Sequence, residues 1–323
     1  MSDHILFSYA LNGPSAGQAL TGDAIARELE ADTLAWVHLD LSHAETPDWV
    51  RQNLSYLDRH AVDALLAEET RPRATRIGDG LLVFLRGVNL NEGAEPEDMV
   101  SLRLWIDDHR IVSLRRRQLR AINDIRERVD AGTGPETAGQ FVALLLDRLT
   151  SRIEPVLAEI DDSADELEEA LVEHASPELR RPITDIRRRA IHLRRYLAPQ
   201  RDAVSMIRTS EVHWLEDINR RRLAEAQDRL TRIVEDLDAI RERSQIVKDE
   251  LTNALADRLN RNTYVLSVIA AIFLPLGFLT GLLGINVGGI PGTDNPAAFA
   301  IFCGMLIVVV AAQVVVFRLL RWF

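Results

Sequence analysis

The sequence is poor in several residue types, and each shortage excludes a class of protein. It has one cysteine, Cys303, in 323 residues, which excludes a disulfide framework and any cysteine-rich zinc fold. Lys248 is the single lysine, so nearly all basic side chains are arginines. The 49 Asp and Glu residues outnumber the 38 Lys and Arg residues, for a formal net charge of −11. That balance disfavours a protein that binds nucleic acid.

Charge is missing from one long stretch near the C-terminus. Between Asn262 and Phe317 the only charged residue is Asp294, and residues 264–285 and 297–317 form uncharged runs of 22 and 21 residues. At ~1.5 Å per residue, each run spans the ~30 Å hydrocarbon core of a bilayer. Neither run has a polar stripe, which disfavours a buried hairpin of a soluble protein. The sequence therefore predicts two transmembrane helices joined by a short turn.

Flanking charges predict the orientation of this hairpin. Arg258 and Arg261 precede the first run, and Arg318 and Arg321 follow the second, whereas the link carries only Asp294. The positive-inside rule then places both termini in the cytoplasm and the short loop outside. The N-terminal residues lack the basic and apolar regions of a signal peptide. We therefore expect a cytoplasmic domain before the hairpin.

Residues 1–134 carry the patterns of an α+β domain with a mixed sheet. Short apolar or alternating runs bounded by turn residues predict strands at 5–10, 34–40, 80–88, 100–106 and 110–114. Helical spacing predicts helices at 47–57 and 59–68, with Thr46 as the N-cap of the first.

From about Pro135 the pattern is helical. Residues 154–173 hold nine acidic residues and no basic one, and an arginine-rich helix follows a cap at Ser176 and Pro177. This contrast predicts an antiparallel pair held partly by surface charge, worth a few tenths of a kcal/mol per pair. Two solvated faces without such pairing are the open alternative.

The last helix before the membrane has a coiled-coil-like apolar seam. We expect it to run without a break from Ser210 to Gly284 and to pack on its own domain or on other copies. The seam residues recur at steps of seven, three and four: Leu223, Leu230, Ile233, Leu237, Ile240, Val247, Leu251, Leu255 and Leu259.

Two spans per chain cannot enclose a pore, so transport requires several chains around one axis. The first span is the better pore helix because Gly277, Gly281 and Gly284 give it a face of small residues. Pro275 removes one hydrogen bond there and permits a bend. The second span is almost purely aliphatic apart from Gln313, as suits contact with lipid. Packing of the glycine face in a dimer is the alternative.

Several motifs in the C-terminal region carry a specific resemblance. They are Ile-Phe-Leu-Pro-Leu at 272–276, Thr-Gly at 280–281, Gly-Ile-Asn at 284–286 and the ending Phe-Arg-Leu-Leu-Arg-Trp-Phe at 317–323. Together they resemble the CorA metal-ion transporter family, whose signature is Gly-X-Asn at the end of the penultimate span. The resemblance is detailed over residues 255–323 and architectural over the rest.

Within that family the chain looks most like the ZntB zinc-transporting branch. Gly-Ile-Asn-Val-Gly-Gly-Ile-Pro-Gly at 284–292 and Trp-Val-His-Leu at 36–39 carry this likeness. Magnesium-transporting members usually have an aromatic residue where this chain has Leu283, a hydroxyl residue where it has Gly277, and a more acidic loop. The resemblance thus implies Zn²⁺ as the transported ion, with Mg²⁺ and Co²⁺ as alternatives, and no cofactor.

The resemblance also implies an assembly and a pore. It implies a homopentamer in the bacterial inner membrane, with lipid around it, a cytoplasmic funnel, and Asn286 as the outer ring. Carboxamide oxygens can hydrogen-bond the waters of a hydrated dication without stripping it. A simple helix C-cap is the alternative role for Asn286. The other implied pore positions, of which Leu274 and Leu266 suit hydrophobic constrictions, are Gly284, Ile285, Gly281, Gly277, Leu274, Leu266, Thr263 and Asn260.

The expected division of the chain combines these elements. It has an α/β domain, helical hairpins, a stalk helix, a pore-lining span, a periplasmic loop, an outer span and a cytoplasmic tail. Their expected bounds are 1–134, 135–209, 210–263, 264–286, 287–296, 297–317 and 318–323.

The histidines of the domain give no closed zinc-site spacing, since His38, His60, His109, His174, His192 and His213 are dispersed. The best cluster is His213 with Glu216 and Asp217 at the top of the stalk. A surface histidine on a charged helix is the competing interpretation.

Three function classes follow. The leading hypothesis is a pentameric zinc transporter, and the second is a magnesium or cobalt channel of the same architecture. A membrane-tethered sensor without permeation explains the hairpin and the stalk, but not the glycine-lined span. We expect no enzyme, because residues 1–261 show no phosphate loop, nucleophile elbow or paired-ligand motif.

Overall fold

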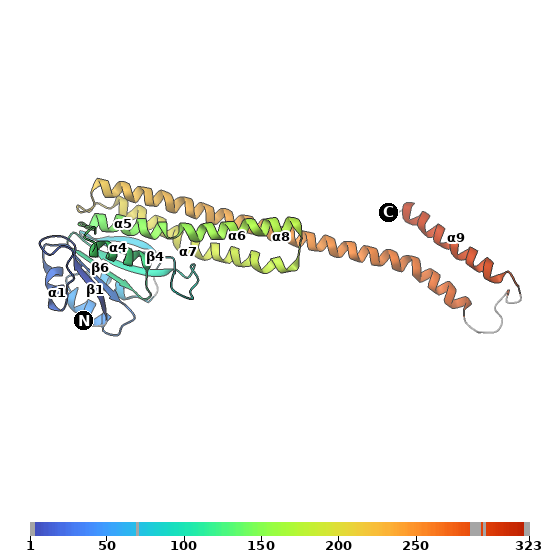
Figure 1. Cartoon of the computed structure of the whole chain (residues 1–323), viewed down its shortest axis with the longest axis horizontal. Coiled ribbons are helices and arrows are strands. Elements are labelled where there is room, and N and C mark those ends of the chain that lie inside the picture. The colour runs from blue at the N-terminus through green and yellow to red at the C-terminus, as the bar shows by residue number, and fades with distance from the viewer. Residues whose placement is uncertain (1–3, 69–70, 285–291, 293–294, 320–323) are drawn as a thin grey trace. The chain divides into compact units, whose positions relative to one another are not determined.

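The computed structural model describes residues 4–68, 71–284, 292 and 295–319 (Figure 1). The chain forms two compact units, an N-terminal unit, Met1–Asp249, and a C-terminal unit, Glu250–Phe323. Each unit is described by itself.

A six-stranded mixed sheet forms the centre of the N-terminal unit. Strands β2 and β6 pair in parallel and all other neighbours are antiparallel. The α+β class and the five expected strands are confirmed, while β3 was not expected. In spatial order the strands are β1 (Ile5–Ala10), β2 (Ala35–Asp40), β6 (Arg110–Arg115), β5 (Val100–Ile106), β4 (Gly80–Gly87) and β3 (Arg73–Ile77).

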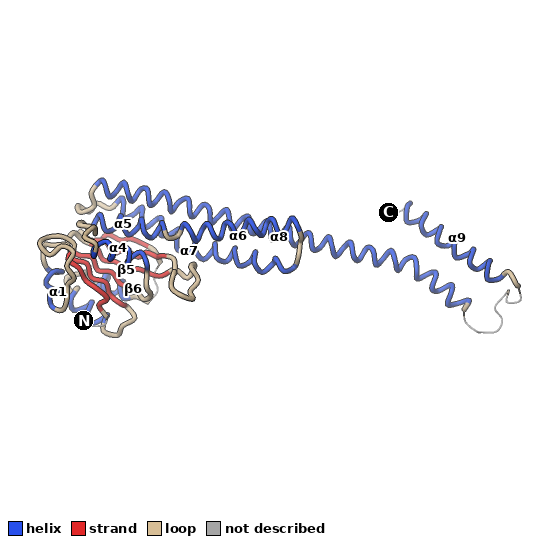
Figure 2. Tube along the Cα trace, viewed as in Figure 1, coloured by secondary structure: helices blue, strands red, loops and turns tan. Residues whose placement is uncertain are grey.

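Helices cover both faces of the sheet, as Figure 2 shows. Helices α1 (Asp23–Glu30), α2 (Thr46–Asn53) and α3 (Arg59–Leu66) share a smaller core with one face. Alternate residues of β4 separate the two cores: Leu82 and Phe84 belong to the smaller one, and their neighbours to the larger one. Such alternation in a strand buried on both faces fixes the register of the central sheet.

The larger core joins the other face of the sheet to a layer of helices. Ser176 accepts a hydrogen bond from the Glu178 N–H, as expected of a cap, before the short 3₁₀ turn Pro177–Leu179. The layer consists of α4 (Arg120–Asp130), α5 (Ala138–Ser151), α6 (Glu154–Glu173), α7 (Arg180–Thr209) and the first part of α8 (Asp217–Leu283).

Helix α8 begins at Asp217 rather than at Ser210. The segment before it buries Val212, Trp214 and Leu215 in the larger core. Trp214 Nε1 also donates a hydrogen bond to the Asp79 carbonyl at 3.0 Å. Packing of these apolar side chains against the sheet thus replaces the expected first turns of the helix.

The apolar seam of α8 is buried for most of its length. From Leu223 to Leu251 its residues are at most 4% exposed, so the expected packing on the chain's own domain is confirmed there. Leu259, the last seam residue, is 66% exposed. The end of the seam is therefore left uncovered by the residues that the structure describes.

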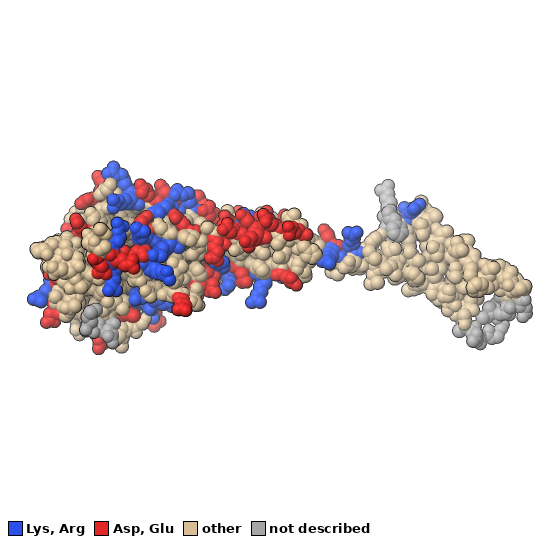
Figure 3. Space-filling view, in the orientation of Figure 1, with Lys and Arg blue, Asp and Glu red and all other residues tan. Residues whose placement is uncertain are grey.

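The C-terminal unit contains the apolar part of α8 and α9 (Ala298–Leu319). Both helices carry an apolar window long enough to cross a membrane, and no part of either window is buried. Charged side chains crowd the visible face of the N-terminal unit (Figure 3). In the described C-terminal unit they are confined to residues 250–261 and Arg318. The two expected membrane helices are thus present.

Candidate functional site

The described pore candidates share one face of α8. At 100° per residue they fall within an arc of about 120°. All of them are exposed, with Leu266 and Leu274 at 67% and 73%. Ile285 and Asn286 lie outside the described residues. The described positions are Asn260, Thr263, Leu266, Leu274, Gly277, Gly281 and Gly284.

The opposite face of α8 is the half-buried one. Its residues centre roughly 160° away from the candidate face, and Ala271 on this face contacts Gln313 of α9. The candidate face is therefore the side of the helix that α9 leaves open. The half-buried residues are Val268, Ala271, Ile272, Pro275, Leu276 and Leu279.

Two glycines on the candidate face, Gly277 and Gly281, are not explained by packing among the described residues, whereas a Cβ atom on Gly284 would lie 2.8 Å from the Thr280 carbonyl oxygen. A Cβ atom placed on Gly277 or Gly281 meets no heavy atom within 4 Å. Gly277 also borders an apolar groove of about 620 Å³ between α8 and α9. Small residues on an open helix face leave room for close approach of another chain or for a wide lumen.

Gln313 supplies a hydrogen-bond donor in place of the backbone N–H that Pro275 lacks. Pro275 has no N–H, so the Ala271 carbonyl, four residues earlier, loses its intrahelical partner. Gln313 Nε2 donates to that carbonyl at 3.2 Å. The sequence offered one signal for this pairing: a single amide in an aliphatic span, opposite a helix that contains a proline.

The histidine cluster expected at the top of the stalk is arranged differently. His213 Nε2 lies 3.0 Å from Asp108 Oδ2, and Glu216 caps the start of α8 through its backbone carbonyl. Within the described part of the chain, the ligand atoms of His213, Glu216 and Asp217 do not meet as a group of three within 4.8 Å.

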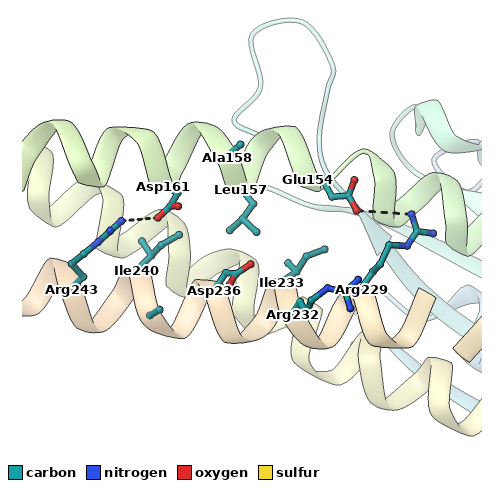
Figure 4. Close-up of a pocket in the computed structure, with 11 residues that line it drawn as sticks. Glu154, Leu157, Ala158, Asp161, Arg229, Arg232, Ile233, Asp236, Ile240 and Arg243 are labelled. Carbon is teal, nitrogen blue, oxygen red and sulfur yellow. Dashed lines mark hydrogen bonds and ion pairs between the residues drawn. The ribbon is translucent and has the colours of Figure 1, made fainter. Parts of the chain in front are cut away.

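Acidic helix α6 is held by arginines of both its neighbours. Arg189 of α7 lies 2.9 Å from Glu159, and Arg243 of α8 lies 2.6 Å from Asp161. Figure 4 shows a cleft of about 490 Å³ between α6 and α8, with the Arg243–Asp161 pair at one end and the Arg229–Glu154 pair at the other. Because these carboxylates face guanidinium groups, the cleft is a charge-balanced seam between helices and a poor cation site.

His38, in the Trp-Val-His-Leu run, is a core residue. It lies in β2, fully buried, with Nδ1 at 2.7 Å from Ser113 Oγ and Nε2 accepting from Arg115 Nε at 3.1 Å. Burial, together with the neighbouring Arg115 charge, lowers the pKa of His38 to about 3. The neutral His38 imidazole uses both ring nitrogens in hydrogen bonds to residues of β6. Neither nitrogen is left to bind a metal.

Together these features define a membrane protein with an α+β N-terminal unit and two C-terminal helices fit to cross a bilayer. The family model described as "CorA-like Mg2+ transporter protein" matches residues 31–319. The chain therefore belongs to the CorA-like transporter family, which is a family of transporters and not of enzymes.

Curated relatives agree with this assignment. The chain is 43% identical over 322 residues to the divalent cation transporter CmaX of Pseudomonas aeruginosa, covering 98% of this chain and 96% of the relative. It is 39% identical over 305 residues to the zinc transport protein ZntB of Yersinia enterocolitica, covering 94% and 92%. The resemblance drawn from the sequence is confirmed.

Solved structures confirm the fold class. The full-length CmaX structure matches with a TM-score of 0.87 at 42% identity, covering 100% of this chain and 99% of that one. The CorA magnesium transporter of Methanocaldococcus jannaschii matches with a TM-score of 0.77 at 16% identity, covering 98% of each chain, which is a likeness of fold alone.

Proposed function

We propose that the chain carries Zn²⁺ across the bacterial inner membrane as a homopentamer whose pore is lined by α8. The observation that carries this proposal is the open face of α8, opposite the half-buried face that contacts α9. A helix in lipid gains nothing by exposing glycines and polar side chains to hydrocarbon, so this face suits an axis shared with other copies. The zinc-transporting relatives support the choice of ion.

The residues of this face have distinct roles in the proposed pore. Asn286 forms a ring of amide oxygens at the outer mouth, which binds the dication through its water shell. Gly277, Gly281 and Gly284 keep the lumen wide below that ring. Leu274 and Leu266 narrow it to apolar constrictions, and Thr263 and Asn260 rehydrate the ion at the inner end.

The proposed topology follows from the arginines at the membrane boundary. Residues 1–263 and 318–323 lie in the cytoplasm, spans 264–286 and 297–317 cross the membrane, and 287–296 faces the periplasm. Arg258, Arg261 and Arg318 support this arrangement through the positive-inside rule. His213 with Glu216 and Asp217 remains a proposed metal site, which requires rotation of these side chains because their ligand atoms do not meet within 4.8 Å.

Zinc flux into proteoliposomes tests the pore assignment. Asn286→Ala removes the amide ring, and we expect zinc uptake to fall to the protein-free background while the oligomer mass stays that of a pentamer. Asn262→Ala is the matched control: the same side chain is lost from an exposed site on α8 that lies off the candidate face. Undiminished flux in the Asn286 variant contradicts the proposal, as does a purified particle smaller than a pentamer.

A magnesium or cobalt channel is the second candidate, because the matching family model is named for Mg²⁺. The two candidates share a structure and differ only in the ion. Competition in one flux assay separates them: excess Mg²⁺ leaves zinc uptake intact if zinc is the substrate. Preferential uptake of Mg²⁺ or Co²⁺ overturns the assignment of zinc.

A further inference from the structure

Three metal-ligating side chains meet at one edge of the N-terminal unit. Among the described residues, His4, His43 and Glu45 form one group in which a ligand atom from each lies within 4.8 Å of the others. His4 Nδ1 lies 3.1 Å from Glu45 Oε2, and the two imidazole ring centroids are 5.8 Å apart. None of these residues belongs to the pore candidates or to the His213 group.

Strand pairing brings the three together from distant parts of the sequence. His4 precedes β1, and its carbonyl accepts a hydrogen bond from the Asp40 N–H at the end of β2, at 2.9 Å. The chain turns directly after β2, so that the His43 N–H donates to the Asp40 carbonyl at 3.3 Å. Glu45 follows as the N-cap residue of α2. The edge pair β1–β2 therefore sets the spacing of the ligands.

Burial within the group is graded in a way that suits an open metal site. The His4 side chain is 6% exposed, and its Nε2 atom has no hydrogen-bond partner in the described chain. The other ring nitrogen, Nδ1, faces Glu45 Oε2 at 3.1 Å and is the nitrogen placed to bind an ion within the group. His43 is half-buried and the Glu45 side chain is 66% exposed. Solvent thus reaches the group from the side of Glu45.

We propose that His4, His43 and Glu45 bind one Zn²⁺ ion, with water as the fourth ligand. Two imidazoles and one carboxylate are a donor set that zinc takes in three-ligand sites with an open position. Magnesium prefers oxygen donors, so the two nitrogens select zinc and similar transition dications. This site shares no residue with the proposed pore, so its binding of an ion can be measured apart from transport.

The adjustment needed for binding falls on the exposed ligands. Tetrahedral zinc with bonds of about 2.0–2.1 Å separates its ligand atoms by roughly 3.4 Å, so the widest gap of up to 4.8 Å must close. Rotation of the Glu45 and His43 side chains closes it without disturbing His4. His43 Nδ1 accepts a hydrogen bond from the Glu45 N–H at 3.3 Å, so binding of the ion through His43 Nε2 keeps that bond. Binding then ties the residue before β1 to the start of α2.

Zinc binding by the purified full-length protein tests this site. Titration with Zn²⁺ by calorimetry, and with Co²⁺ by visible absorption, measures stoichiometry and coordination. We expect His43→Ala and Glu45→Gln each to remove one bound Zn²⁺ per chain, together with the tetrahedral Co²⁺ absorption. Both residues lie at the surface, so the variants keep the fold, which circular dichroism checks.

His174→Ala is the matched control, since His174 is an exposed histidine outside the group. We expect it to bind as many Zn²⁺ ions as the unaltered protein does. Wild-type stoichiometry and affinity in the folded His43 variant overturn the proposal. Because the test measures binding, it does not depend on zinc flux. An Asn286 variant that loses transport but still binds Zn²⁺ at His4, His43 and Glu45 shows that the two proposals can fail independently.

Discussion

Replacing Gln313 by methionine should weaken the contact between α8 and α9. The loss of free energy depends on Pro275, because the proline leaves the Ala271 carbonyl without a donor inside α8. The substitution keeps the length and apolar contact of the side chain but removes the amide donor at 3.2 Å from the Ala271 carbonyl. That carbonyl then has no donor, since Pro275 cannot provide one. In membrane proteins, such interhelical hydrogen bonds contribute about 0.6–1.7 kcal/mol.

A double-mutant cycle isolates this term from other effects of the substitution. In Pro275→Ala the backbone N–H returns and satisfies the Ala271 carbonyl inside α8. Gln313→Met should therefore cost about 1 kcal/mol more in the wild-type background than in the Pro275→Ala background. The cycle also cancels the effect of removing Gln313 Oε1, which has no partner in the described chain.

The free energy of unfolding of the detergent-solubilised full-length protein, taken from denaturant titration, measures all four corners of the cycle. Ala312→Leu, a change of a neighbouring residue on α9 that leaves the amide in place, serves as a control and should show no coupling to Pro275. If the Gln313 and Pro275 substitutions are additive within about 0.3 kcal/mol, the amide does not replace the bond that the proline removes.

Two further predictions concern the N-terminal unit. Leu237→Ala, in the fully buried part of the seam, should lower the free energy of unfolding by about 2–5 kcal/mol. Ile246→Ala, at 58% exposure on the same helix, should lower it by less than about 0.5 kcal/mol. Denaturant unfolding measures both. His38 is neutral in the folded protein because burial, with Arg115, lowers its pKa to about 3. Above the ordinary pKa of 6.5 this costs the folded state nothing. As the pH falls from 6.5 toward 3, the unfolded chain binds a proton at His38 that the folded chain does not, so the free energy of unfolding decreases. Thermal melts from about pH 7 to 5 should show a loss approaching 1.4 kcal/mol per pH unit, and His38→Gln should flatten it; an equal slope in that variant contradicts this account.

Patterns with a strong period predicted most of the fold. The steps of seven, three and four from Leu223 to Ile240 coincide with burial in the larger core. The uncharged runs coincide with the apolar helices of the C-terminal unit. The short apolar run in β4 likewise predicted a strand, and the structure places Val83 and Phe84 in different cores. Where burial alone decides the structure, the sequence carries the information.

Elements stabilised by pairing were harder to foresee. Strand β3 (Arg73–Ile77) is mostly exposed and has no apolar alternation, so its backbone bonds to β4 hold it in the sheet. Helix α1 starts at Gly22 without a side-chain cap. Thr46, expected as an N-cap, instead donates its hydroxyl hydrogen to the Asp40 carbonyl, and Glu45 takes the cap position. These outcomes depend on backbone pairing and capping, which the pattern of apolar residues does not show.

The two metal proposals differ in the same way. Asn286 was found from a local motif, whereas His4 meets Glu45 across 41 residues only because β1 pairs with β2. The dispersed histidines gave no spacing signal, since a site built across a strand pair has no fixed sequence interval.

The course of α8 links the burial pattern to the proposed assembly. Up to Leu251 its apolar seam is covered by the chain's own helices, and from Leu259 onward the same helix exposes apolar residues and then glycines. In the first part, substitution of a seam leucine acts on the stability of one chain. In the second part Leu259 is 66% exposed among the described residues. Its truncation should therefore leave the unfolding of one chain unchanged and act instead on association between copies. An effect on association without an effect on unfolding is expected if α8 lines an axis shared by several copies. It is not expected of a monomer.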